Sequence, residues 1–216
     1  MNRGLTPAIL VLATLVLQAS PAWAKRPNPV VEREGDPGFA PNPESSDAAG
    51  LDGDTWKLET KEASIRLRQL PDTDRQAYLR EHARSETDPF ATYPGRRRGF
   101  QTFLLELENR GGGSAIFQPQ RCLLIVRQDE VLYPLDLPAL ESAYGALDRE
   151  LPPAYRAAAR AMLDGERILG PGEKVSGLLI YRAVDPKTKR FTVEVALTTS
   201  TGKNIGFEAP YRRLRR

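Results

Sequence analysis

The chain has 216 residues, with 31 lysines and arginines against 28 aspartates and glutamates and a formal net charge of +3. So small an excess of positive charge does not indicate a nucleic-acid-binding protein. A single cysteine excludes an internal disulfide, and with a single histidine it forms no recognisable set of metal ligands. A serine or cysteine nucleophile would need that one histidine as its base, and neither Cys122 nor any serine has a nucleophile signature. We therefore expect a protein that is not an enzyme and that needs no cofactor.

Residues 1–24 have the pattern of a secretory signal peptide. Arg3 supplies the positive start, residues 5–17 are mostly apolar, and residues 22–24 read Ala-Trp-Ala, a small-x-small cleavage site. The apolar run is shorter than the ~20 residues of a spanning helix, and Pro21 interrupts it. This favours cleavage after Ala24 over a retained membrane anchor. We expect an exported protein, either periplasmic or secreted.

Residues 25–53 are rich in proline, glycine, serine and acidic residues, and their apolar residues are few and scattered. Such a segment cannot bury enough apolar surface to offset the entropy lost on ordering, and its prolines favour an extended backbone. We predict a disordered, Pro-rich linker over residues 25–53 and a folded domain over residues 54–211. Residues 212–216 then form a basic tail.

Two short strands and a helix are predicted to open the domain. Trp56 and Leu58 alternate with charged residues, and the apolar residues from Ala63 to Leu67 alternate with a serine and arginines. Asp72 is expected to cap a helix that runs to about Arg84. Because this helix has few apolar residues, it should be a short surface helix.

A long strand is predicted from Phe100 to Asn109. The three glycines at 111–113 form a turn and not a phosphate loop, because no Gly-Lys-Ser/Thr leads into a helix. Short strands follow at 115–118, 122–127 and 130–133, the last two as a hairpin. Cys122 starts an apolar run, so we predict a buried hydrophobic residue and not a reactive thiol.

The hydrophobic period becomes helical between residues 136 and 165. Leu140, Tyr144 and other apolar residues recur at helical spacing after Asp136, which is expected to cap the first helix. Two prolines then separate it from a second helix, which should end at residues 164–165. We predict that this two-helix insertion covers one face of a sheet.

The last strands form the expected core. The apolar run from Leu178 to Tyr181 predicts a central strand that is buried on both faces. Phe191 to Thr198 alternate, and Ile205 and Phe207 should face inward in a final strand. About nine short strands without a strand–helix repeat indicate a mainly β protein, folded as an antiparallel sandwich.

Two motifs resemble those of a known group of proteins. The long strand contains L-x-L-x-N, from Leu105 to Asn109, and P-G-E-x-x-x-G extends from Pro171 to Gly177. Both are similar to motifs of exported bacterial immunoglobulin-like sandwich domains, most of which have no assigned function. The resemblance covers residues 54–210 and implies an immunoglobulin-like antiparallel sandwich. It implies no catalytic residues, and the helical insertion departs from the plain fold.

The candidate binding residues are basic and fall into three groups. Each arginine beside an anionic surface contributes ~1 kcal/mol, so these groups point to an anionic lipid or glycan; the alternative is that they only solubilise loops and termini. They are Arg96, Arg97 and Arg98 in a loop, Lys187, Lys189 and Arg190 in a turn, and Arg212, Arg213, Arg215 and Arg216 in the tail.

Two acidic residues keep a hydrolase open as a third alternative. Glu106 and Glu108 share one strand face about 7 Å apart, a separation that glycosidases use. Alternating glutamates on a strand are more often a solvated face, and His82 is expected to be a surface residue.

The sequence thus leaves three hypotheses of function. The first is a non-enzymatic exported domain that binds an unknown protein partner in the cell envelope. The second is a binder of anionic membrane or glycan surfaces, and the third is a hydrolase. None of the three involves nucleic acid.

Overall fold

The computed structural model describes residues 38–45, 49–91, 100–127, 129–146, 155–185 and 187–214. The predicted signal peptide, Arg96 to Arg98, Arg215 and Arg216 lie outside these residues. Among the helices of the described ranges, none is both long and apolar enough to cross a bilayer.

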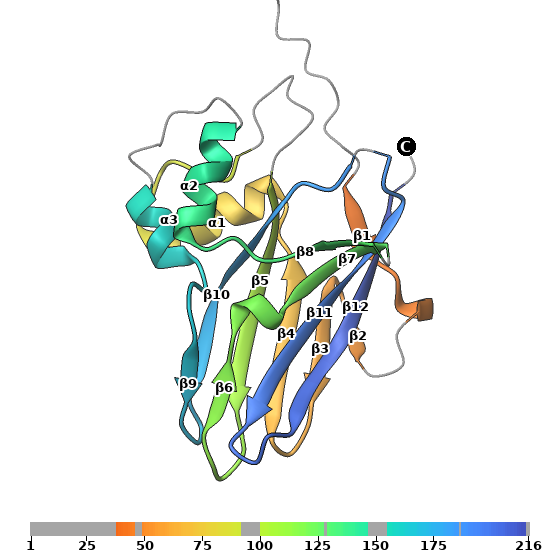
Figure 1. The fold of residues 1–216 in the computed structure, drawn as a ribbon, viewed down its shortest axis with the longest axis vertical. Coiled ribbons are helices and arrows are strands. Elements are labelled where there is room, and N and C mark those ends of the chain that lie inside the picture. The colour runs from red at the N-terminus through yellow and green to blue at the C-terminus, as the bar shows by residue number, and fades with distance from the viewer. Residues whose placement is uncertain are drawn as a thin grey trace, which may run out of the picture. The chain divides into compact units, whose positions relative to one another are not determined.

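Two antiparallel sheets form the fold (Figure 1). The five-stranded sheet has, in spatial order, β10 (Lys174–Arg182), β5 (Phe100–Asn109), β4 (Ala63–Gln69), β3 (Thr55–Glu59) and β2 (Gly50–Asp52). The seven-stranded sheet has β1 (Phe39–Pro41), β12 (Asn204–Arg213), β11 (Arg190–Thr199), β6 (Ala115–Phe117) and β9 (Arg167–Leu169), with β7 (Leu123–Arg127) paired to both β11 and β8 (Glu130–Leu132). The prediction of a mainly β, antiparallel protein is confirmed. The three strands that the sequence did not predict, β1, β2 and β9, have only three residues each.

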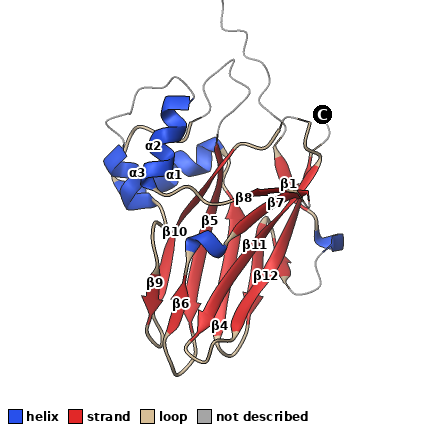
Figure 2. Ribbon diagram, viewed as in Figure 1, coloured by secondary structure: helices blue, strands red, loops and turns tan. Residues whose placement is uncertain are grey.

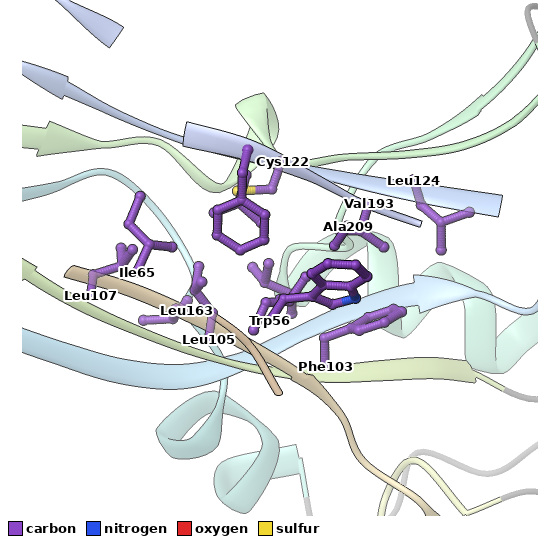
Figure 3. Packing of buried hydrophobic residues seen from close by; sticks show 14 of the residues in the cluster. Trp56, Ile65, Phe103, Leu105, Leu107, Cys122, Leu124, Leu163, Val193 and Ala209 are labelled. Carbon is purple, nitrogen blue, oxygen red and sulfur yellow. The ribbon is translucent and has the colours of Figure 1, made fainter. Parts of the chain in front are cut away.

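The core lies between the two sheets. Trp56, Phe103 and Val193 are fully buried there, and Figure 3 shows side chains of opposite sheets pointing toward one another. The ring of Phe103 lies 5.4 Å from that of Tyr211 and 6.1 Å from that of Phe191, so aromatic contacts join the sheets. Each such side chain stabilises the fold by about 1.5–3 kcal/mol through burial. The inward alternation predicted for β5, β11 and β12 is confirmed.

A second apolar cluster joins the helices to the five-stranded sheet. It contains side chains of α1 (Asp72–Ala83), α2 (Leu137–Ala146) and α3 (Tyr155–Ala161), which gather beside β10 (Figure 2). Leu178 and Ile180 belong to this cluster, whereas Leu179 and Tyr181 belong to the core between the sheets. The prediction that two inserted helices cover a sheet face is confirmed, and it explains why β10 is apolar on both sides. Two short 3₁₀ helices, η1 (Pro43–Ser45) and η2 (Pro119–Arg121), complete the elements.

The predicted central position of the Leu178 strand is wrong. Strand β10 lies at one end of the five-stranded sheet. Its outer edge is closed by two loop segments, because the N–H of Leu135 donates to the carbonyl of Ile180 at 2.7 Å and that of Leu163 to Leu178 at 3.0 Å. An edge strand that is covered has the same apolar sequence pattern as a central strand, because both kinds of strand bury their side chains on two faces.

The helix ends partly follow the prediction. Asp136 caps α2, since its Oδ1 accepts a hydrogen bond from the N–H of Ala139 at 2.8 Å. Asp72 does not cap α1: Pro71 holds the cap position, and Asp72 accepts instead from Arg75 Nη2 at 2.9 Å. Helix α3 ends at residue 161 and not at 164–165, because the next residue, Met162, bridges to β10.

The predicted linker needs a correction. Residues 25–37 and 46–48 lie outside the described residues, but β1, η1 and β2 all fall within 25–53. Strand β1 pairs with β12, and Phe39 packs its ring 4.6 Å from that of Phe191. One aromatic anchor and edge pairing are enough to order this stretch, although its composition is poor in apolar residues.

Asn109 links the two sheets. Its side chain is 2% exposed, and its Nδ2 lies within 2.8–3.1 Å of the carbonyl oxygens of Gly113, Leu169 and Gly170. Its Oδ1 accepts from the N–H of Gly111 at 3.0 Å. Leu169 belongs to β9 in the seven-stranded sheet, so one amide joins the ends of both sheets. The asparagine of the L-x-L-x-N motif therefore has a structural role.

We predict that Asn109→Asp destabilises the domain by about 3 kcal/mol, because a buried carboxylate would face carbonyl oxygens that need a donor. The loss should be smaller at acidic pH, where a protonated carboxyl donates one hydrogen bond. Urea unfolding at both pH values measures this. Asn204→Asp is the matched control, since exposed Asn204 uses only its Oδ1, as an acceptor from Thr198 at 2.8 Å. Equal stability of the two variants would contradict the role of Asn109.

Candidate functional site

A basic pocket of about 270 Å³ lies where β7 ends and β11 begins. Arg127 contributes from the end of β7, and Lys187, Lys189 and Arg190 contribute from the β10–β11 loop and the first residue of β11. The remaining lining residues are Val126, Asp185 and Thr188. The pocket therefore combines the basic turn predicted from the sequence with an arginine from a different hairpin.

The backbone that carries the two lysines is fixed by hydrogen bonds. Asp185 accepts from the N–H of Lys187 through Oδ1 at 2.7 Å and from the N–H of Thr188 through its carbonyl at 2.8 Å. On the other side, Arg213 donates from Nε to the carbonyl of Thr188 and from its N–H to that of Lys189, each at 2.8 Å. A ligand would not have to order this loop, so little affinity would be lost to conformational entropy.

Arg213 therefore supports the pocket by holding the backbone of its loop. Its guanidinium stacks 4.6 Å above the ring of Phe39, a cation–π contact with strand β1. The side chain is half-buried and holds the loop through Thr188. Arg213 was predicted as a surface-binding residue of the basic tail, but its contacts give it a structural role.

Arg212 differs from Arg213 in its surroundings. It is exposed and lies directly opposite Arg190 in the β11–β12 ladder. Within the part of the chain that the structure describes, neither side chain makes an ion pair or a side-chain hydrogen bond. Like charges placed opposite one another destabilise a sheet. A bound anion would relieve that repulsion.

Arg127 is a pocket residue that sequence reasoning missed. The sequence places it correctly at the end of a strand, but it does not show that β7 pairs with β11, where Leu124 lies opposite Val193. Its carboxylate neighbour is Glu130, with Nη2 and Oε2 3.7 Å apart, and the arginine side chain is 70% exposed. Such an exposed pair leaves Arg127 largely available to a ligand.

The two glutamates of the hydrolase hypothesis lie among cations. Glu108 is 3.0 Å from Arg110 Nε and 3.4 Å from Lys174 Nζ. The hydrogen bond from Arg110, followed by that from Lys174, lowers the pKa of Glu108. Glu106 lies 3.9 Å from Arg66. These contacts are those of a charged, solvated sheet face, and an ionised Glu108 is unsuited to act as a general acid.

His82 and Cys122 do not form a pair of nucleophile and base, because the first is exposed and the second is fully buried. His82 is exposed on α1, with its ring stacked 4.2 Å from that of Tyr78. Cys122 is fully buried, and burial raises the pKa of its thiol to about 12. No group of three or more potential metal ligands occurs within the described ranges.

The remaining predicted residues were Arg96, Arg97, Arg98, Arg215 and Arg216. All five lie outside the described residues. Of the seven arginines predicted as surface-binding, the structure therefore places two, Arg212 beside the pocket and Arg213 behind it.

No protein-family model matches the chain, and no curated protein sequence matches it. The solved structures that resemble it are bacterial proteins of β-rich fold. The yjhA protein from Bacillus subtilis is 13% identical, over 64% of this chain and 76% of that one, with a TM-score of 0.37. A FixG-related protein from Vibrio parahaemolyticus is 12% identical, over 72% and 100%, with a TM-score of 0.36. A functionally unknown protein from Listeria monocytogenes EGD-e is 9% identical, over 78% and 85%, with a TM-score of 0.40. Similarity of this degree transfers no function.

We predict that Cys122 does not react with thiol reagents in the folded protein. At a pKa of about 12, about one thiol in 10,000 is ionised at pH 8. Labelling with a chromogenic disulfide should be slow in buffer and rapid in denaturant. Rapid labelling in buffer would show that Cys122 is accessible.

Proposed function

We propose that this protein is a non-enzymatic binding domain, exported from the cytoplasm, that holds anionic groups in the basic pocket. One observation carries the proposal: four cations from two separate chain segments line one pocket, on a backbone fixed from both sides. If each contributes ~1 kcal/mol, together they correspond to a dissociation constant of about 1 mM. A surface that offers many anionic groups, contacted at several such sites at once, would be bound more tightly.

The opposed pair Arg190 and Arg212 supports the same proposal. The register places the two arginines opposite one another, and like charges in such positions destabilise a sheet. A sheet that had only to fold would favour an ion pair at this position. Their juxtaposition beside the pocket fits an anionic ligand that offsets the repulsion.

This proposal develops the second hypothesis drawn from the sequence. A protein partner in the cell envelope stays a prediction, because no described surface points to one chemistry of partner. Export rests on the signal-peptide pattern of residues 1–24. The hydrolase is not favoured, since Glu106 and Glu108 are paired with cations.

We also propose that the sandwich is immunoglobulin-like. Supporting this, the two motifs that carry the resemblance lie side by side: Asn109 donates its N–H to the carbonyl of Glu173 at 3.0 Å, and Gly172 donates to the carbonyl of Asn109 at 2.7 Å. A Cβ on Gly177 would lie 2.8 Å from Leu163 Cγ, so the last glycine of the motif lets a loop approach β10 closely. An experimental structure that gives the strand order tests this proposal.

The pocket proposal is tested by titration calorimetry with inorganic pyrophosphate at low salt. The wild-type protein should bind, and added salt should weaken binding because the contacts are ionic. Lys189→Gln with Arg190→Gln should lower the affinity about 30-fold, taking ~1 kcal/mol for each cation. The control is Arg167→Gln, which removes an exposed charge from β9, an edge strand. Equal binding by the double variant and the control would overturn the proposal.

We further predict that Arg212→Gln stabilises the free protein by about 0.5 kcal/mol at low salt, because it removes the repulsion from Arg190. The same substitution should weaken pyrophosphate binding. Thermal unfolding with and without ligand measures both effects. A variant that loses stability in the absence of ligand would contradict the repulsion between the two arginines.

A further inference from the structure

We infer that the basic pocket selects a phosphate monoester, a small group that carries close to two negative charges. This inference rests on the proposed function and names its ligand class. It follows from the charge of the pocket, the separate chain segments that supply its cations and its size.

The charge of the pocket matches a dianion. Four cationic side chains line it, against one lining carboxylate, Asp185. At its rim, Glu130 lies 3.7 Å from Arg127, and Arg212 lies opposite Arg190. At least two positive charges therefore remain uncompensated. A phosphate monoester carries about −1.5 to −2 at pH 7. A phosphodiester or a carboxylate, with one charge, would leave part of the repulsion in place.

The cations approach from different directions. Lys187 lies in the turn that is closed by the hydrogen bond from the N–H of Thr188 to the carbonyl of Asp185, and Lys189 follows that turn. Both lysines are exposed and line the pocket. Arg127 comes from β7, on a separate hairpin. Arginine binds oxyanions as a planar fork and lysine as a point charge. A group with three terminal oxygens can meet both kinds at once, whereas a diester or carboxylate offers only two.

The pocket is also small. Its volume of about 270 Å³ lies at the lower limit of the ~300–1,000 Å³ usual for small-molecule sites. This is room for one phosphorylated group and its first attached atoms. A single site of this size suits a phosphate at the end of a molecule and not one within a polymer backbone.

The test compares three anions at one ionic strength: methyl phosphate, dimethyl phosphate and acetate. By calorimetry, methyl phosphate should bind at least about tenfold more tightly than the other two. Arg127→Gln and Lys187→Gln should each lower its affinity about fivefold, taking ~1 kcal/mol for each cation. Both side chains are exposed, so these variants should fold, and Arg167→Gln is again the control.

The outcomes separate the two proposals. Equal affinity for all three anions, with loss of binding in the pocket variants, would overturn the selection of monoesters and leave the anion-binding function standing. No binding of any anion, pyrophosphate included, would overturn the proposed function itself. A preference for dimethyl phosphate would also overturn the inference.

A vesicle experiment identifies the source of the phosphate. Phosphatidic acid carries a monoester and phosphatidylglycerol a diester, so vesicles of the first should retain more protein at equal lipid charge. Release of the protein from the vesicles by soluble methyl phosphate would show that the lipid and the soluble ligand bind the same pocket. Tighter binding to phosphatidic acid than to methyl phosphate assigns a lipid headgroup; equal or weaker binding assigns a soluble phosphorylated molecule.

Discussion

The buried hydrogen bonds of Asn109 add a directional link between the sheet ends to the strand pairing and apolar packing that also join them. Its amide reaches the β5–β6 turn at Gly113 and the end of β9 at Leu169, while its backbone bonds to the turn that precedes β10. Apolar packing fixes how close the two sheets lie, but it is not directional. Buried hydrogen bonds are directional, and leaving them unmade is costly. Asn109 therefore sets the relative position of the sheet ends at this side of the sandwich, and the P-G-E turn is placed by the same contacts.

The helices solve a different problem for the same sheet. Strand β10 ends the five-stranded sheet, where an exposed apolar face and an open edge would favour aggregation. The helical cluster covers the face through Leu178 and Ile180, and the loops at Leu135 and Leu163 close the edge. Helix α1 has little apolar surface, and a buried ion pair between Arg75 and Asp88, with Nη2 and Oδ2 2.7 Å apart, helps to hold it. Such a pair is weak evidence for stability, but breaking it would leave a buried charge.

The basic pocket depends on contacts between the first and the last strands of the described residues. Phe39, near the start of the described residues, lies under Arg213, near their end, and Arg213 holds the loop of Lys187 and Lys189. The loop that carries Lys187 and Lys189 is thus held by contacts that do not involve their charged groups. Because the supporting contacts are aromatic and backbone hydrogen bonds, the charged groups remain available to a ligand. A charged site on a rigid scaffold loses little entropy on binding.

The sequence by itself determined the local structure. Alternation in residues 191–198, the helical period after Asp136 and the apolar run at 178–181 predict strands and helices that the structure contains, because each pattern is the repeat of one backbone geometry. The cap at Asp136 and the burial of Cys122 followed from local chemistry in the same way. Only the tertiary structure decided the edge position of β10, the order in the predicted linker and the pairing of β7 with β11. These depend on contacts between residues far apart in the chain, which no local repeat records. For that reason Lys187, Lys189 and Arg190 could be recognised from the sequence as basic residues, whereas Arg127, the opposed Arg212 and the supporting Arg213 acquired their roles only when the strands came together.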